Sequence, residues 1–255
     1  MAKTKKSRRR VAWVIAPATV LAVATARRAR RRRALAADES RPADVAFMRA
    51  MHAAFRRDLA RLESVAPHVD RSGFMTPQVR TGWTAFRDWL RDHHAAEDDD
   101  LWPVLRARLV DASALREVDA MVAEHRSIPG ALAAVDAALA NGFGVRSAAA
   151  DLAAMVHDHL DHEERSVFPL LEQHLSRQEW RRFLETERDR HSLRERPRWL
   201  AWVLDDASER DAAAVMAEMP RPAHVVYRWF LRPRYAAEHR WQTEATLARW
   251  RGRAA

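Results

Sequence analysis

The sequence predicts an all-α protein, an up-down-up-down four-helix bundle followed by a helical C-terminal extension. Only six of the 255 residues are glycine, whereas alanine, arginine, leucine and the acidic residues dominate, a composition that favours helices over strands. Apolar residues recur every three or four positions in four long segments, as on the buried face of a helix. Short loops join these segments, and short connections favour antiparallel neighbours.

Helix-start and helix-stop signals set the expected boundaries. The predicted helices, in chain order, span residues 42–65, 76–109, 111–141 and 147–174. Residues 66–75 contain Pro67 and form a loop. Thr76 and Pro77 combine a capping residue with proline at the first helical position. Gly142 follows the third segment as a typical helix stop.

Residues 176–255 are predicted to form the helical extension beyond a bundle at residues 41–175. Ser176 and Glu179 match a capping box that starts another helix, and prolines divide the remainder into shorter helical pieces. Five tryptophans in this extension are predicted to act as packing anchors: Trp199, Trp202, Trp229, Trp241 and Trp250.

The first forty residues form a distinct basic segment. They carry twelve Lys and Arg against two acids, whereas the other 215 residues carry 32 basic and 33 acidic groups. No specific nucleic-acid partner is therefore expected for the folded part. Residues 11–26 are apolar but span only about 24 Å as a helix, short of a bilayer core. We expect a short membrane anchor or surface helix, a disordered basic tail, or a cleaved signal, and a cytoplasmic location with membrane association through this segment.

Each of the four apolar stripes contains histidine or glutamate where the period requires an apolar residue. The absence of cysteine excludes thiolate metal sites and iron–sulfur clusters. Burying carboxylates without compensation is costly, and metal coordination is the usual compensation for buried His and Glu. Hydrogen-bonded polar core residues or a misassigned apolar stripe are the alternatives. At about 1.5 Å per residue, however, all six groups fall in one slab of roughly 10 Å. The predicted metal ligands are His52, His93, Glu97, His125, His159 and Glu163.

An internal repeat strengthens this interpretation. His93-x3-Glu97 recurs as His159-x3-Glu163, and each carboxylate is followed six residues later by proline. These prolines are expected to kink or end their helices at equivalent points. Residues four apart lie on one helix face, so both can reach one centre. The repeat suits two metal ions bridged by the two carboxylates, with Glu164 as a substitute for Glu163. Spacing alone leaves iron, manganese and zinc open.

These residues resemble the hemerythrin-like family of HHE cation-binding domains over about residues 42–175. The matching motifs are Met51-His52, His93-His94-Ala95-Ala96-Glu97-Asp98, Glu124-His125 and His159-Leu160-Asp161-His162-Glu163-Glu164. The resemblance implies a di-iron centre, with two carboxylate-bridged iron ions as cofactor, and dioxygen, nitric oxide or peroxide as the small ligand.

One departure concerns the third helix. Oxygen-carrying hemerythrins have five histidine ligands, two of them one turn apart on that helix, whereas Met121 and Pro129 lie four residues from His125. The site is therefore expected to be one terminal ligand short, which favours redox or peroxide chemistry. His94 and His162 are expected to lie outside the ligand shell or on the surface.

Three functions follow in order of preference. The first is a di-iron protein that binds or senses dioxygen, nitric oxide or peroxide. The second is a di-iron enzyme that decomposes peroxide or performs an oxidation, based on the missing ligand. The third is a metal-independent helical interaction protein tethered by its basic N-terminus. Enzymatic activity is left open with a preference against it, and no oligomeric state is predicted.

Overall fold

The protein is described from a computed structural model that covers residues 28, 30–33, 36–217 and 219–243. It divides into two units, residues 1–41 and 42–255. The apolar segment 11–26, for which membrane association was predicted, lies outside the described residues. None of the described helices combines the length and the apolarity needed to cross a membrane. The second unit is helical, with no strand among its described residues, so the predicted all-α class is confirmed.

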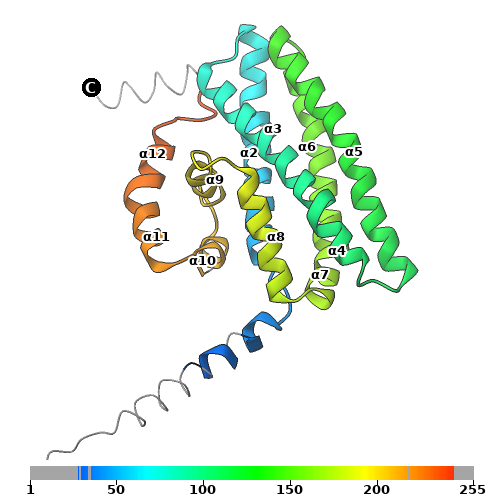
Figure 1. Cartoon of the computed structure of the whole chain (residues 1–255). Helices are drawn as coiled ribbons and strands as arrows, with labels where there is room; N and C mark the ends of the chain where they lie inside the picture. Colours follow the sequence, from blue (N-terminus) through cyan, green and yellow to red (C-terminus); the bar gives the residue numbers. More distant parts are fainter. Residues whose placement is uncertain (1–27, 29, 34–35, 218, 244–255) are drawn as a thin grey trace, which may run out of the picture. The chain divides into compact units, whose positions relative to one another are not determined.

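Four long helices carry the candidate site. They are α2 (Ala46–Ser72), α3 (Pro77–Ala96), α5 (Ala112–Asn141) and α6 (Val145–His162). Figure 1 shows them side by side, and α2 packs against both α3 and α6 while α5 packs against α6. Their facing apolar stripes form one continuous hydrophobic core.

Most of the predicted helix signals occupy their expected positions. The Thr76 side chain accepts a hydrogen bond from the backbone N–H of Val79 at the start of α3. Asp111 caps α5 in the same way. Gly142 ends α5 with φ of 65°, a left-handed conformation that glycine adopts without steric cost.

The first long helix ends later than predicted. Residues 66–72, expected in a loop, belong to α2, and Pro67 lies inside the helix. Val65, Ala66 and Val69 are buried, so their burial in the core offsets the backbone hydrogen bond that proline removes. The helix ends at Gly73, which adopts φ of 64°.

The second and fourth predicted helices are interrupted at equivalent points. A π-helical turn, η1 (Glu97–Leu101), separates α3 from α4 (Trp102–Arg106). A second π-helical turn, η2 (Glu163–Val167), separates α6 from α7 (Phe168–His174). Proline stands in the first turn of both α4 and α7, where its missing N–H is tolerated. Each of these two predicted helices is thus a pair of helices joined by a wider turn, with the interruption close to the repeated proline.

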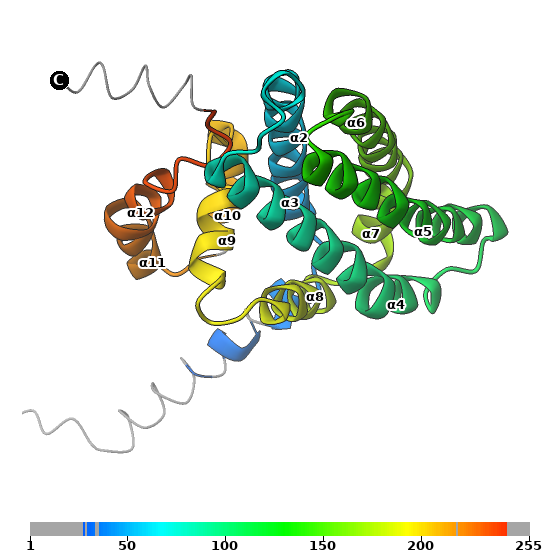
Figure 2. The ribbon, with the colours of Figure 1, turned by 90° about the horizontal axis from the view of Figure 1, so that it is seen from above.

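The extension packs against the long helices rather than apart from them. Its helices are α8 (Arg177–Arg190), α9 (Arg196–Val203), α10 (Glu209–Ala217), α11 (Arg221–Val226), η3 (Tyr227–Leu231) and α12 (Arg232–Ala236). The predicted capping box at Ser176 and Glu179 is present. Figure 2 shows α8 beside α3, and α9 and α10 contact α2.

A buried carboxylate on α2 anchors the extension. Asp58 accepts hydrogen bonds from the indole N–H groups of Trp202 and Trp241, each at 2.9 Å. Arg240 donates to the same carboxylate at 3.1 Å. The expected packing role thus holds for these two tryptophans and for the buried Trp199. It is wrong for Trp229, which is 67% exposed, and Trp250 lies outside the described residues.

Candidate metal centre

The two π-helical turns place the two central carboxylates. Glu97 is the first residue of η1 and Glu163 is the first residue of η2. Both side chains are fully buried. In each turn the next helix begins with a backbone N–H that donates to the carbonyl five residues earlier, at Glu97 or Glu163. Such turns often occur at functional sites, because they change the direction of a side chain within a helix.

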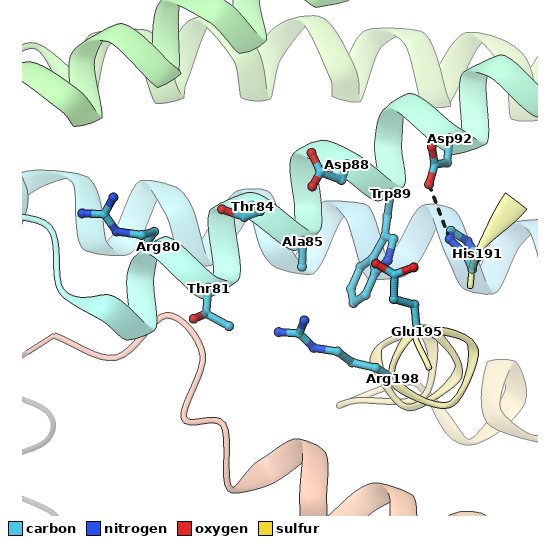
Figure 3. A pocket seen from close by; sticks show the side chains of 10 residues that line it. All are labelled: Arg80, Thr81, Thr84, Ala85, Asp88, Trp89, Asp92, His191, Glu195 and Arg198. Carbon is cyan, nitrogen blue, oxygen red and sulfur yellow. Dashed lines mark ion pairs between the residues drawn. The ribbon is translucent and has the colours of Figure 1, made fainter. Parts of the chain in front are cut away.

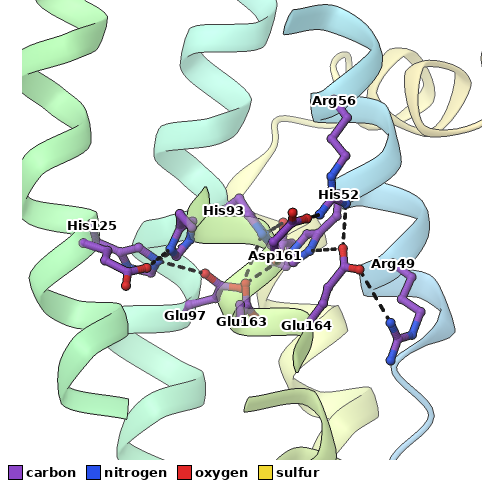
Figure 4. Close-up of polar contacts among 12 residues, drawn as sticks. Arg49, His52, Arg56, His93, Glu97, His125, Asp161, Glu163 and Glu164 are labelled. Carbon is purple, nitrogen blue, oxygen red and sulfur yellow. Dashed lines mark hydrogen bonds and ion pairs between the residues drawn. The ribbon is translucent and has the colours of Figure 1, made fainter. Parts of the chain in front are cut away.

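The four predicted histidines surround these carboxylates. His52 Nε2 lies 3.3 Å from Glu163 Oε2, and His93 Nε2 lies 3.3 Å from Glu97 Oε1. His125 Nε2 lies 3.5 Å from the other oxygen of Glu97 and 3.2 Å from Nε2 of His159. All four histidines are buried. The structure therefore brings all six predicted residues together, as Figure 4 shows for five of them.

Several polar atoms in this cluster are buried without a hydrogen-bond partner. They are Nε2 of His52, His93 and His94 and both side-chain oxygens of Glu97 and Glu163. Orphaned buried polar atoms are rare, and buried charges require a partner. Imidazole nitrogens and carboxylate oxygens are suitable ligands for iron, manganese or zinc. The donor set therefore fits metal ions, which would supply the partners that the protein itself does not.

The two carboxylates cannot ionise together at low cost without a cation. Burial and the negative charge of Glu163 raise the pKa of Glu97 well above its usual range. Burial also acts against ionisation of Glu163, but the neighbouring His52, His159 and His93 together outweigh it and lower the pKa of Glu163 to about 2. One buried carboxyl is thus held ionised while its neighbour resists ionisation, an imbalance that a bound cation would remove.

A fifth imidazole belongs to the cluster. His94, expected to be peripheral or exposed, is 7% exposed and lies within a group formed with His125 and His159. Burial and the adjacent His125 lower its pKa well below the usual value, so His94 is neutral and can offer a nitrogen lone pair. His94 is therefore a candidate for the terminal ligand that the site was expected to lack.

The ligand atoms divide into two sets. Those of His52, His93 and Glu97 lie within 4.8 Å of one another, as do those of His94, His125 and His159. Each set has three donors, enough to begin a metal site. Two neighbouring sets suit a centre of two ions, with carboxylate oxygens between them.

Each predicted histidine ligand has a carboxylate at its other ring nitrogen. The Nδ1 contacts are His52 to Glu164 at 3.0 Å, His93 to Glu187 at 3.2 Å, His125 to Asp98 at 2.9 Å and His159 to Glu124 at 2.8 Å. An ionised carboxylate can only accept, so Nδ1 keeps the proton. Nε2 is then left with its lone pair directed into the cluster, as in metal-binding histidines.

The alternatives Glu163 and Glu164 occupy different places. Glu163 lies inside the cluster, whereas Glu164 lies on the outer side of His52 and also accepts a hydrogen bond from Arg56 at 2.6 Å. Arg49 forms an ion pair with the other oxygen of Glu164 at 3.6 Å (Figure 4). Glu163 is therefore the carboxylate positioned to contact a metal ion, and Glu164 orients a histidine.

Sequence reasoning missed the burial of His94 in the cluster and the contacts of the four carboxylates with Nδ1 atoms. The spacing of Phe86, Leu90 and His94, four residues apart in each step, could have revealed the buried face on which His94 lies. Asp98 and Glu124 are each adjacent in sequence to a predicted ligand, so the local pattern could have indicated that they lie near the cluster. Glu187 is 94 residues from His93 in the chain, and no local pattern indicates their contact.

A recess between α5 and α6 reaches the cluster. It measures about 520 Å³, and its lining includes His159, Met155 and Ile128. At its margin, His162 bridges Glu124 and Glu117 through its two ring nitrogens at 2.7 and 2.9 Å. The recess is large enough for a small molecule and brings it to one of the buried histidines.

A separate recess lies between α3 and the segment from His191 to α9 (Figure 3). It measures about 370 Å³ and is lined by both acidic and basic side chains. His191 forms an ion pair with Asp92 at 3.5 Å and packs against Trp199. None of the six predicted ligands lines this recess, so it is distinct from the candidate metal centre.

Comparison with known proteins identifies one family. The family model described as "Hemerythrin HHE cation binding domain" matches residues 43–171, just over half of the chain. The matched range contains every residue of the cluster except Glu187. No curated protein and no solved structure matches the chain.

Proposed function

This chain belongs to the hemerythrin HHE cation binding domain family, and from this premise we propose that it is a non-haem di-iron protein that binds or senses dioxygen, nitric oxide or peroxide. The observation that carries the proposal is the buried set of imidazole nitrogens and carboxylate oxygens without hydrogen-bond partners. Family membership and the absence of thiolates favour iron among the metals that suit these ligands. We further propose that α2, α3, α5 and α6 form an up-down-up-down bundle around this centre.

The candidate ligands would form two groups, one for each ion. His52, His93 and Glu97 would hold one ion, and His94, His125 and His159 would hold the other, consistent with the two sets of ligand atoms. Glu97 and Glu163 would bridge them. The bound metal would supply electron exchange and affinity for small oxygen- or nitrogen-containing ligands.

The protein's own side chains control how such a ligand reaches the centre. The recess between α5 and α6 gives a small molecule a route to His159. Phe55, Phe168 and Trp102 are buried and flank the histidine cluster with apolar surface. These aromatic side chains exclude bulk water from the centre, so its charged groups interact strongly.

The proposal of binding or sensing is preferred to an enzyme. The enzyme alternative was based on an expected vacant ligand position. We propose that His94, which lies beside His125 and His159, would fill that position. The alternative of a metal-independent interaction protein depends on the basic N-terminus, which lies largely outside the described residues. It does not account for the buried, unpartnered carboxylates.

Metal analysis of the purified full-length chain tests the proposal. We expect two irons per chain and the absorption of an oxidised di-iron centre that bleaches on reduction and responds to dioxygen, nitric oxide or peroxide. A variant that combines Glu97→Ala and Glu163→Ala should lose both the bound iron and the di-iron absorption. Combined Glu172→Ala and Glu185→Ala, at two exposed glutamates, is the matched control and should keep them. Unchanged iron content in the first variant would exclude the proposed centre.

A further inference from the structure

We propose that Glu187 of α8 is a positioning residue for the metal centre, through which the C-terminal extension holds His93 in its ligating orientation. This inference rests on the proposed function, because it assigns a role towards the bound metal. Glu187 lies outside the range that matches the family model. The proposal therefore gives the extension a part in the chemistry of the centre.

The position of Glu187 on α8 makes its burial unusual. Trp180 and Phe183 form the buried face of this helix, and Glu187 lies on the same face one turn after Phe183. The side chain is 2% exposed. An apolar residue would be expected there, as at the six predicted ligand positions, so the carboxylate requires a compensating partner.

That partner is His93. Oε1 and Oε2 of Glu187 lie 3.2 and 3.4 Å from its Nδ1, so one N–H is shared between the two oxygens. Among the described residues, no lysine or arginine pairs with Glu187. A carboxylate accepts and does not donate, so this contact keeps the proton on Nδ1 and leaves Nε2, 3.3 Å from Glu97, free to bind a metal.

Glu187 is also the most enclosed of the four carboxylates at Nδ1 positions. Its side chain is 2% exposed, against 22% for Glu164, 34% for Glu124 and 35% for Asp98. Water screens a charge less when the charge is buried. The negative charge of Glu187 should therefore act on a metal ion held by its histidine with less screening than the charges of the other three.

The α8 helix is held in a fixed position relative to α3. The capping box fixes its first turn, and Ala43 N–H donates to the carbonyl of Leu175 at 2.9 Å just before it. Near its end, Arg190 bridges Asp99 and Asp100 of η1 at 2.9 and 2.8 Å. The helix that carries Glu187 is thus tied to the π-helical turn that carries Glu97.

Two substitutions separate charge, hydrogen bonding and packing. Glu187→Gln keeps the shape and an oxygen acceptor but removes the charge. Glu187→Met keeps a similar volume and removes both the charge and the hydrogen-bond acceptor. Glu185→Gln, on the exposed face of the same helix, is the matched control. All four proteins are studied as full-length chains.

The measurements are Fe²⁺ binding, the midpoint potential of the loaded centre, and thermal unfolding of the metal-free chain. We expect Glu187→Met to weaken binding of one ion by about 10- to 100-fold, the usual effect of losing such a partner. Glu187→Gln should have an intermediate effect. Both should raise the midpoint potential, because removal of a nearby negative charge disfavours the oxidised centre.

A purely packing role predicts a different pattern. Glu187→Met would then leave Fe²⁺ affinity and midpoint potential equal to those of wild type and Glu185→Gln, with the metal-free chain folded. That result would overturn the inference while the proposed function stands. If wild type itself retains no iron, the proposed function fails and the role of Glu187 fails with it.

Discussion

The His94 ring stacks on the His125 ring, with centroids 4.2 Å apart and planes inclined by 16°. The two imidazoles come from different helices, α3 and α5, and both lie beside His159. One ring nitrogen of each of these three histidines lies within 4.8 Å of the others. His94 thus adds a fifth imidazole to the cluster, and it comes from α3 rather than from α5.

Replacement of His94 tests this relationship. His94→Leu should lower the iron content from two ions towards one, because only the set containing His94 loses a donor. Iron content and the optical spectrum measure the effect. His174→Gln, a histidine outside the cluster at the end of α7, is the control and should retain both ions. Equal iron content in the two variants would remove His94 from the ligand set.

Metal removal should destabilise the protein. Without cations, the buried oxygens of Glu97 and Glu163 have no hydrogen-bond partners, and ionised carboxylates in such an environment are costly. A metal that binds only the folded state adds about 2.7 kcal/mol at a free concentration one hundred times its Kd. Chelation should therefore lower the melting temperature, and readdition of Fe²⁺ should restore it. A melting temperature indifferent to chelation would contradict the metal assignment.

Loss of the Asp58 carboxylate should destabilise the extension. Asp58→Asn leaves Arg240, which is almost fully buried, without its charged partner and weakens the hydrogen bonds from Trp202 and Trp241. Breaking a buried ion pair typically costs about 3–5 kcal/mol. Urea unfolding should show this loss. Asp206→Asn, at a side chain that is 78% exposed and paired with Arg61, should change stability by less than about 1 kcal/mol.

Two glycines in helices should respond in opposite directions. A Cβ at Gly82 would lie 2.5 Å from the Trp241 ring, whereas one at Gly130 would meet nothing within 4 Å. Gly82→Ala should therefore displace the indole and cost about 1–3 kcal/mol. Gly130→Ala should stabilise α5 by about 0.4–1 kcal/mol, because alanine reduces the entropy of the unfolded chain. Thermal unfolding of the two variants measures the change in stability in each case. A Gly82→Ala protein as stable as wild type would refute the close contact.

Sequence patterns failed where a helix departs from regular geometry. The repeats around Glu97 and Glu163 indicated two equivalent proline-linked interruptions, but not the π-helical turns that begin at those residues. A wider turn shifts the angular position of every later residue, which a constant helical period does not describe. Pro67 was predicted to lie in a loop, but it lies inside α2. The tertiary packing of Val69 keeps the helix intact beyond this proline.

The sequence by itself determined the helical class, most of the capping positions and the six inward-facing His and Glu residues. These depend on periodicity and on neighbours within a few residues, which are local properties of the chain. Only the tertiary structure decided the contacts of Glu187 with His93 and of Asp58 with Trp241, across 94 and 183 residues. Such contacts depend on how whole helices pack, and helix packing brings together residues that no sequence period relates.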